Sequence, residues 1–392
     1  MTQDLASLLA AAGEKAARLA AERISPHDFS SPEAGFPFDI WQAMGRAGLL
    51  GLALPVEYGG GGLGYQGLSL AGLELVRHGG CLGLALSVAL HQIVGRFLVD
   101  GFGDEEQRRR FLPDLAAGRT IGCMAVSEPG TGAHPKHLAT SAVLKGGAYI
   151  LNGEKTYLTN GPIASLFVVM AVTGQKAEGR KRITAFLVPR DTPGLSLAEP
   201  MRLDFLRPAP HGGIRLKDAA VPAENRLGPE GEAYEAMVKP FRDVEDGVMM
   251  GPGAGGLLRQ LELMAAHIQA QGVAQTDGLR EDLGRLKALA ETLAVLAGEA
   301  ARRLDEPAAQ EKLASLTLAA RQLRQLYHTQ YQTLASKIGL SPAGPLAALT
   351  KDLDRTGGIA GNVTRLKLVR LGASLFPGIF MPRPSGVAPA KG

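Results

Sequence analysis

AVSEPGTGAH at residues 125–134 and LNGEKTYLTNG at residues 151–161 are the two stretches that decide how this chain is organised. They lie in a region of short apolar or alternating runs that are separated by Gly, Asn and Pro. Such runs, four to eight residues long between turn residues, are typical of β-strands. The sequence therefore predicts a β-region from about residue 120 to residue 232.

Helical patterns lie on both sides of this β-region. Apolar residues recur there at spacings of three and four, which predicts helices over residues 3–23, 38–50, 66–78, 84–101 and 105–117 before it, and over 233–271, 278–304, 307–337 and 361–375 after it. The last residues are rich in Pro and Gly and predict an extended arm. We expect an α+β fold with an N-terminal helical domain, a central β-domain, a C-terminal helical bundle and a tail, over residues 1–119, 120–232, 233–375 and 376–392.

Composition excludes several classes of protein. The 392 residues carry a net charge of only +4, and no run of Lys or Arg favours a nucleic-acid partner. Cys81 and Cys123 each lie in an apolar run, which favours a reducing cytoplasm over a disulfide framework. We expect no membrane span, because the longest apolar stretches contain Arg, His or Asp, and the charged N-terminus does not read as a signal peptide. No phosphate-binding glycine loop or metal-spaced His or Cys pattern is present.

Five motifs together resemble the acyl-CoA dehydrogenase family, in order and in spacing, over nearly the whole chain. They are LPVEYGG at 54–60, FGDEEQRRRFLPDLAAG at 102–118, AVSEPGTGAH at 125–134, LNGEKTYLTNG at 151–161 and VPAENRLGPEG at 221–231. The resemblance implies a central β-barrel, a C-terminal four-helix bundle and FAD between the two. It also implies a flavin oxidoreductase that removes an α-proton and a β-hydride from an acyl thioester and leaves a 2-enoyl thioester.

The resemblance also implies which residues meet the flavin. Ser127 and Thr159 match the hydroxyl residues that approach the isoalloxazine ring. Met124 and Val126 flank the first of them, and Tyr157 takes the aromatic position beside the ring. The alternative is that Ser127 and Thr159 only satisfy turn backbone.

Three departures from the family pattern affect the ligands. The Ser expected next to the thioester arm is absent, and Ala133 and His134 stand in that loop. There, His134 is expected either to meet a CoA phosphate or to be solvated. The R-x-x-F-G motif that reaches the FAD diphosphate from a neighbouring subunit is replaced by 271–275, and a Gly-Gly-Asn-Gly turn by 338–344. Losing that Arg removes a charge-assisted phosphate contact, so FAD is held differently, weakly or not at all.

The catalytic base is also displaced. The family places a Glu eight residues after Asp352, but this chain has Ala360 followed by Gly361, and we expect both to line the acyl pocket. Isovaleryl- and long-chain-type members carry the base on the first long helix of the bundle instead. Glu245 matches that position, and its pKa would have to be raised by burial.

The alternative for Glu245 is an acidic helix start, since Asp and Glu are favoured in a first helical turn. Asp243 and Asp246 are expected to raise the pKa of Glu245. Close approach at this helix is expected from Gly247, Gly251 and Gly253.

Three functions remain open at this point. The first is an FAD-dependent dehydrogenase that acts on acyl-CoA or another acyl thioester, passes electrons to an electron-transferring flavoprotein or similar acceptor, and forms a homodimer or homotetramer. The second is a non-catalytic, FAD-deficient subunit of a hetero-oligomer. The same scaffold could also oxidise another substrate with flavin.

Overall fold

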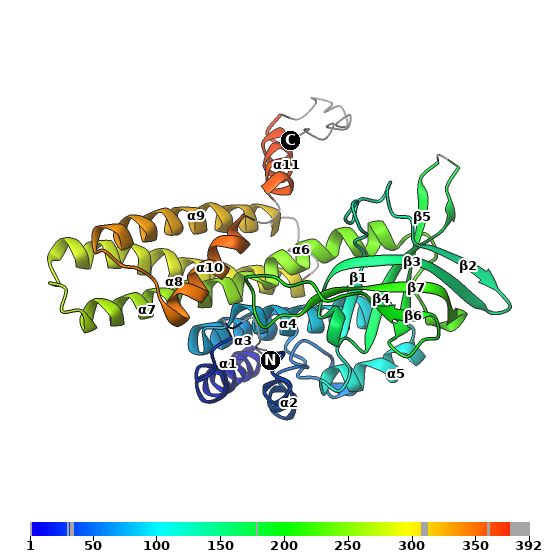
Figure 1. Cartoon of the computed structure of the whole chain (residues 1–392), viewed down its shortest axis with the longest axis horizontal. Coiled ribbons are helices and arrows are strands. Elements are labelled where there is room, and N and C mark those ends of the chain that lie inside the picture. The colour runs from blue at the N-terminus through cyan, green and yellow to red at the C-terminus, as the bar shows by residue number, and fades with distance from the viewer. Residues whose placement is uncertain are drawn as a thin grey trace.

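The elements follow the predicted order of helices, strands and helices (Figure 1). The computed structural model describes residues 2–29, 31, 35–177, 179–306, 313–358 and 361–376. The N-terminal helices are α1 (Thr2–Leu19), α2 (Phe38–Arg46), α3 (Gly64–Gly79), α4 (Leu82–Ile93) and α5 (Glu105–Ala116). A π-helical turn extends α1 to Ile24 and another extends α4 to Asp100, so the long predicted helices at 3–23 and 84–101 are confirmed.

The helix Leu82–Asp100 is the most apolar of these elements. By length and composition alone it could cross a membrane, which the sequence analysis did not expect of any stretch. In the structure 83% of this window is buried inside the protein. Its residues pack in the core beside α3 and the first strand, so the helix is a core element.

The central region forms one sheet of eight strands. They are β1 (Gly122–Ala125), β2 (Ser141–Lys145), β3 (Ala148–Thr159), β4 (Leu166–Gln175), β5 (Lys181–Pro189), β6 (Leu195–Leu197), β7 (His211–Pro222) and β8 (Arg226–Leu227). The strand order is β6-β7-β3-β2-β4-β5-β8, with β1 parallel to β4 at the side. Among the described strands these pairings do not close into a barrel. The region expected to form a β-barrel forms a sheet whose strand order runs from β6 to β8.

Long helices form the C-terminal part of the molecule. They are α6 (Lys239–Val248), α7 (Met250–Ala270), α8 (Asp277–Asp305), α9 (Leu313–Lys337), α10 (Gly344–Gly357) and α11 (Gly361–Ala373). The sequence analysis missed α10, which starts at a Pro-containing turn where a first-turn Pro costs no hydrogen bond. The predicted helical residues 307–312 and the tail from 377 lie outside the described residues.

Glycines let α7 cross α3 at close range. A Cβ atom at Gly255 would lie 2.1 Å from the carbonyl oxygen of Leu73, and one at Gly251 would lie 2.2 Å from that of Ser69. Gly251 thus lies at the helix crossing, whereas a Cβ atom at Gly253 would have no neighbour within 4 Å. These distances concern α3, and the approach of Glu245 to the acyl pocket stays a prediction.

A buried ion pair joins β3 to the loop after β1. The Lys155 side chain is fully buried and donates to Glu128 Oε1 at 2.8 Å and to the carbonyl oxygen of Val126 at 3.0 Å. The two Glu128 carboxylate oxygens also accept the backbone N–H groups of Ala139 and Thr140. Burial alone raises the pKa of Glu128, but the hydrogen bonds from Lys155 and Thr140 outweigh it and hold the pKa below its usual value. Burial lowers the pKa of Lys155.

Replacing Gly255 with Ala tests the helix crossing. We expect Gly255→Ala to lower the free energy of unfolding by about 1–3 kcal/mol, because the new methyl group overlaps backbone that cannot move aside. Gly253→Ala in the same helix is the matched control and should be neutral or stabilising by about 0.5–1 kcal/mol. Urea unfolding measures both; equal stabilities of the two variants would contradict the close crossing.

Replacing Lys155 with Met tests the buried pair. We expect a loss of about 3–5 kcal/mol of unfolding free energy, because Glu128 is left buried and uncompensated. The control is Lys176→Met, which breaks the exposed pair between Lys176 and Glu232 (2.7 Å) and should lower the unfolding midpoint far less than Lys155→Met does. Similar unfolding midpoints for the two variants would show that the buried pair does not hold this region.

Candidate functional site

The structure brings the predicted flavin-contacting loops together. The backbone N–H of Thr156 donates to the carbonyl oxygen of Ser127 at 2.8 Å, so the loop after β1 lies against the end of β3. Thr159 is the last residue of β3, and it and Ser127 are both half-buried. The loop of Ser127 and the end of β3, which carries Thr159, therefore meet at this hydrogen bond, and both residues keep part of their surface exposed.

Thr159 has a partner that the sequence did not reveal. Its Oγ1 lies 3.1 Å from Nε2 of His211, the first residue of β7, which is paired with Thr159 in the sheet. The other ring nitrogen, Nδ1, lies 3.0 Å from the carbonyl oxygen of Ala209. Burial lowers the pKa of His211 below its usual value. Only the register between β3 and β7 places His211 here, and no local pattern signals it.

The other residues expected near the flavin differ in exposure. Tyr157 is 62% exposed and has a φ of 57°, within an irregular part of the β3–β7 ladder between Lys155 and Leu158. Met124 is half-buried, whereas the Val126 side chain belongs to the core. Tyr157 is thus the accessible aromatic side chain on this part of the sheet.

The residues expected near the substrate arm lie in the loop that follows Glu128. Ala133 is half-buried and His134 is exposed. The His134 ring lies 5.0 Å from that of His137, and His134 Nδ1 accepts the N–H of Lys136 at 3.3 Å. This loop is accessible to a ligand.

Glu245 has the surroundings that a general base needs. It lies in the interior of α6, which begins at Lys239, and its side chain makes no hydrogen bond or ion pair to any residue that the structure describes. Its pKa is raised to about 7: burial is the largest cause, Asp246 adds to it, and Arg242 opposes the shift. The residue as a whole is half-buried, so part of its surface stays accessible to solvent.

The helix-start interpretation of this acidic run is wrong. The first turn of α6 contains no acidic residue, so the macrodipole does not explain Glu245. Asp243 and Asp246 instead pair with Lys367 of α11, at 2.8 and 3.0 Å, and Asp246 also pairs with Arg321 of α9. Asp246 raises the pKa of Glu245 as predicted, but Asp243 is not among the causes of the shift.

Helix α4 connects α6 to the Thr159 region. It packs on α6, and its Ser87 carbonyl oxygen accepts a hydrogen bond from the Asn160 side chain at 2.9 Å. Asn160 directly follows Thr159. One buried helix therefore contacts both the helix of the candidate base and the end of the strand that carries Thr159.

The segment where the family base is expected is only partly described. Ala360 lies outside the described residues, and Gly361 is the first residue of α11. Asp352, on α10, is buried and accepts the backbone N–H of Leu206 at 2.6 Å. Burial raises its pKa to about 6, against the hydrogen bond from Leu206. Asp352 thus holds the loop before β7, a role that the sequence analysis did not assign.

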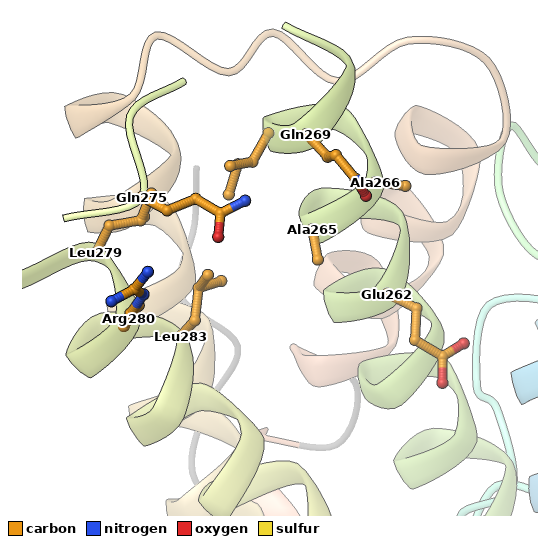
Figure 2. A pocket seen from close by; sticks show the side chains of 9 residues that line it. Glu262, Ala265, Ala266, Gln269, Gln275, Leu279, Arg280 and Leu283 are labelled. Atoms are coloured by element: carbon orange, nitrogen blue, oxygen red, sulfur yellow. The ribbon is translucent and has the colours of Figure 1, made fainter. Parts of the chain in front are cut away.

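A cavity of about 460 Å³ lies between the end of α7 and the start of α8, near residues 271–275 (Figure 2). Gln269 and Ala265 of α7 lie on one side of it and Gln275 and Arg280 on the other, whereas the Glu262 side chain points away from Gln275 and Arg280. Arg280 is the single cationic side chain in its lining, and it pairs with Asp277 at 3.3 Å. That ion pair is exposed to solvent, and the Arg expected at 271–275 is absent from the lining.

The donor set fits FAD at one end. The adjoining hydroxyl residues Ser127 and Thr159 suit the polar edge of an isoalloxazine ring, which needs hydrogen-bonding groups held on rigid backbone. The region of 271–275 lacks the expected Arg. The residues present are thus compatible with a site for the flavin ring, whereas the contact to the FAD diphosphate differs from the family pattern.

Comparison with known proteins agrees with this arrangement. The family pattern for the acyl-CoA dehydrogenase N-terminal domain matches residues 10–119, and that for the middle domain matches residues 123–219. An acyl-CoA dehydrogenase from Bacillus subtilis is 37% identical over 199 residues, which are 51% of this chain and 52% of that protein. A mitochondrial isovaleryl-CoA dehydrogenase from Pongo abelii is 35% identical over 222 residues, 56% of this chain and 52% of that protein. The matches thus span about half the length of these relatives.

The fold is shared over a greater length. The structure of butyryl-CoA dehydrogenase from Megasphaera elsdenii superposes with a TM-score of 0.82 over 94% of this chain and 98% of that one, at 22% identity. At that identity the likeness concerns the fold alone. The two family matches together cover more than half of the 392 residues, and the chain belongs to the acyl-CoA dehydrogenase family.

Proposed function

We propose that the chain is an FAD-dependent acyl-thioester dehydrogenase that forms a 2-enoyl thioester from a saturated one. The observation that carries this proposal is Glu245, a carboxyl group without a polar partner among the described residues, whose pKa is raised to about 7, mainly by burial. Structural carboxylates in proteins are normally paired or solvated, whereas a general base works best with a pKa near the operating pH.

In this proposal each residue has one role. The Glu245 carboxylate accepts the proton from the α-carbon of the acyl thioester. Ser127 and Thr159 orient the flavin ring, and the Lys155–Glu128 pair fixes the loop that carries Ser127. Bound FAD supplies the acceptor for the β-hydride. The loop of Ala133 and His134 meets the thioester arm, and Ala360 and Gly361 line the acyl pocket.

The substrate class follows from the family. Acyl-CoA is the expected thioester, and the base on α6 is the feature that the chain shares with isovaleryl-type members. We propose an electron-transferring flavoprotein or a similar carrier as the acceptor, because Tyr157 presents an exposed aromatic ring two residues from Thr159. Location in the cytoplasm is part of the proposal and is supported by two free, buried cysteines.

One observation favours the second candidate, an FAD-deficient subunit. Residues 271–275 lack the Arg that the family pattern places there, and without it a diphosphate loses a charge-assisted contact. The two candidates differ in flavin content. An FAD-soaked chain that remains colourless after desalting supports the second candidate, whereas a yellow chain that an acyl-CoA bleaches without oxygen supports the first.

The exposed apolar surface of α11 supports a homo-oligomer, either a dimer or a tetramer. Several large apolar side chains on α11 and directly after it are exposed: Leu366, Leu368, Val369, Leu371, Leu375 and Phe376. The helix stands out from the body in Figure 1 and is tied to α6 through Lys367. An apolar surface of this kind marks an interaction site, and a second copy of the chain is the occupant that we propose.

Glu245→Gln tests the base. The variant keeps the shape of the side chain but loses the basic oxygen, so we expect turnover to fall by roughly two to four powers of ten with FAD content unchanged. In the parent protein kcat/KM should rise with pH through about 7, because the carboxyl group is protonated and inactive below its pKa. Stopped-flow bleaching with an acyl-CoA measures both. Glu235→Gln, an exposed acid that precedes α6, is the control and should turn over at the parent rate.

Introducing charged side chains on α11 tests whether this helix forms the interface of a homo-oligomer. We expect the double variant Leu366→Asp/Val369→Asp to give a smaller assembly than the parent, because two carboxylates would be buried in the proposed interface. Light scattering at micromolar concentration measures the mass, with Arg365→Ala/Arg370→Ala on the same helix as control. A parent chain that is already monomeric would reject the homo-oligomer.

A further inference from the structure

We propose that His211 fixes the direction of the Thr159 hydroxyl group and so tunes the reduction potential of a flavin bound beside it. The proposal rests on the proposed function in one respect, namely that FAD lies next to Thr159. The hydrogen-bond assignment itself follows from this chain alone.

The protonation of the imidazole follows from its two partners. The carbonyl oxygen of Ala209, 3.0 Å from Nδ1, can only accept a hydrogen bond, so Nδ1 carries a proton. A neutral ring then has a bare Nε2 that can only accept. Thr159 Oγ1, at 3.1 Å, is the atom that donates to it.

The surroundings of the ring favour this neutral form. Burial lowers the pKa of His211, and its hydrogen bond to Ala209 opposes that shift only in part. No carboxylate among the described residues makes an ion pair with it. The ring therefore stays neutral near neutral pH and keeps its acceptor directed at Thr159.

Backbone hydrogen bonds hold both partners in place. His211 is paired with Thr159 in the ladder between β3 and β7, and its carbonyl oxygen accepts the N–H of Met201 at 2.8 Å. The N–H of Asn160, the residue after Thr159, donates to the carbonyl oxygen of Pro210 at 2.8 Å. Both sides of the Thr159–His211 contact are thus fixed by the fold, and the hydroxyl group is oriented before a ligand binds.

This orientation has a consequence for flavin chemistry. A Thr hydroxyl has one proton, and once His211 accepts it, Oγ1 offers only lone pairs to other groups. The N5 atom of an oxidised flavin accepts hydrogen bonds, whereas after receiving a hydride it carries an N–H that donates. An acceptor-only Thr159 oxygen therefore favours the reduced flavin, and His211 raises the potential by withholding the proton from oxidised N5.

The first test concerns the hydrogen bond and needs no flavin. Imidazole nitrogen signals of the full-length chain with ¹⁵N-labelled histidine report the tautomer of each ring, and loss of signals in His211→Gln identifies His211. We expect a protonated Nδ1 and a bare Nε2. A proton on Nε2 in the neutral ring would overturn the proposal.

The second test concerns the potential of the FAD-loaded chain. We expect His211→Phe to lower the equilibrium constant for two-electron reduction by up to about tenfold, about 30 mV, because the freed hydroxyl can donate to oxidised N5. His211→Gln retains an acceptor oxygen and should stay closer to the parent. In a Thr159→Val background, His211→Phe should have no further effect. His78→Phe, at a half-buried histidine on α3, is the control.

The outcomes separate this proposal from the proposed function. If the chain binds FAD and is bleached by an acyl-CoA but the potential of His211→Phe equals that of the parent, the tuning role fails and the dehydrogenase function stands. If the chain takes up no FAD, the dehydrogenase function and the tuning role both fail. The tautomer of His211 then still shows whether the Thr159 hydroxyl group donates to Nε2. If His211→Phe still shifts the reduction potential in the Thr159→Val background, the effect does not act through Thr159, and the proposal is overturned.

Discussion

The buried ion pair between Lys155 and Glu128 is the constraint on which the candidate site depends. Its four hydrogen bonds join the middle of β3 to the loop after β1 and to the residues that lead into β2. Removing two charges from water is costly, and such a pair persists only when every remaining bond is satisfied. Here the satisfied bonds lie directly on either side of Ser127. The loop that carries Ser127 is therefore held in place by a buried ion pair inside the sheet.

The order of helices and strands could be predicted from the sequence because periodicity is local. Short apolar or alternating runs predicted the strands of residues 120–232, and apolar residues at spacings of three and four predicted the long helices. Helix α10 was missed because it follows a Gly- and Pro-containing turn and buries only a few apolar side chains. The sheet order could not be foreseen beyond the resemblance, since β3 lies between β2 and the distant β7.

The candidate site was predictable only where a motif carried it. Ser127 and Thr159 stand in recognisable loops, and the structure brings those loops together. His211 was missed, because its position next to Thr159 depends on a pairing across 52 residues of chain. For Glu245 the sequence suggested the position and the effect of the adjacent Asp246, whereas the burial of Glu245 and the pairing of Asp243 with Lys367 emerge only from helix packing. The helix-start alternative failed for the same reason: the true start of α6 is set by the π-helical turn before it.

The pairing of Lys367 with Asp243 and Asp246 makes α11 part of the electrostatics of Glu245. Asp246 raises the pKa of that carboxyl group, and Lys367 neutralises Asp246 from a helix whose apolar side chains are otherwise exposed. Moving α11 away would leave the Asp246 charge less compensated and would make ionisation of Glu245 harder. Linkage is reciprocal, so ionising Glu245 must in turn strengthen the attachment of α11. A partner that bound α11 would thereby act as an effector of the proton affinity of Glu245.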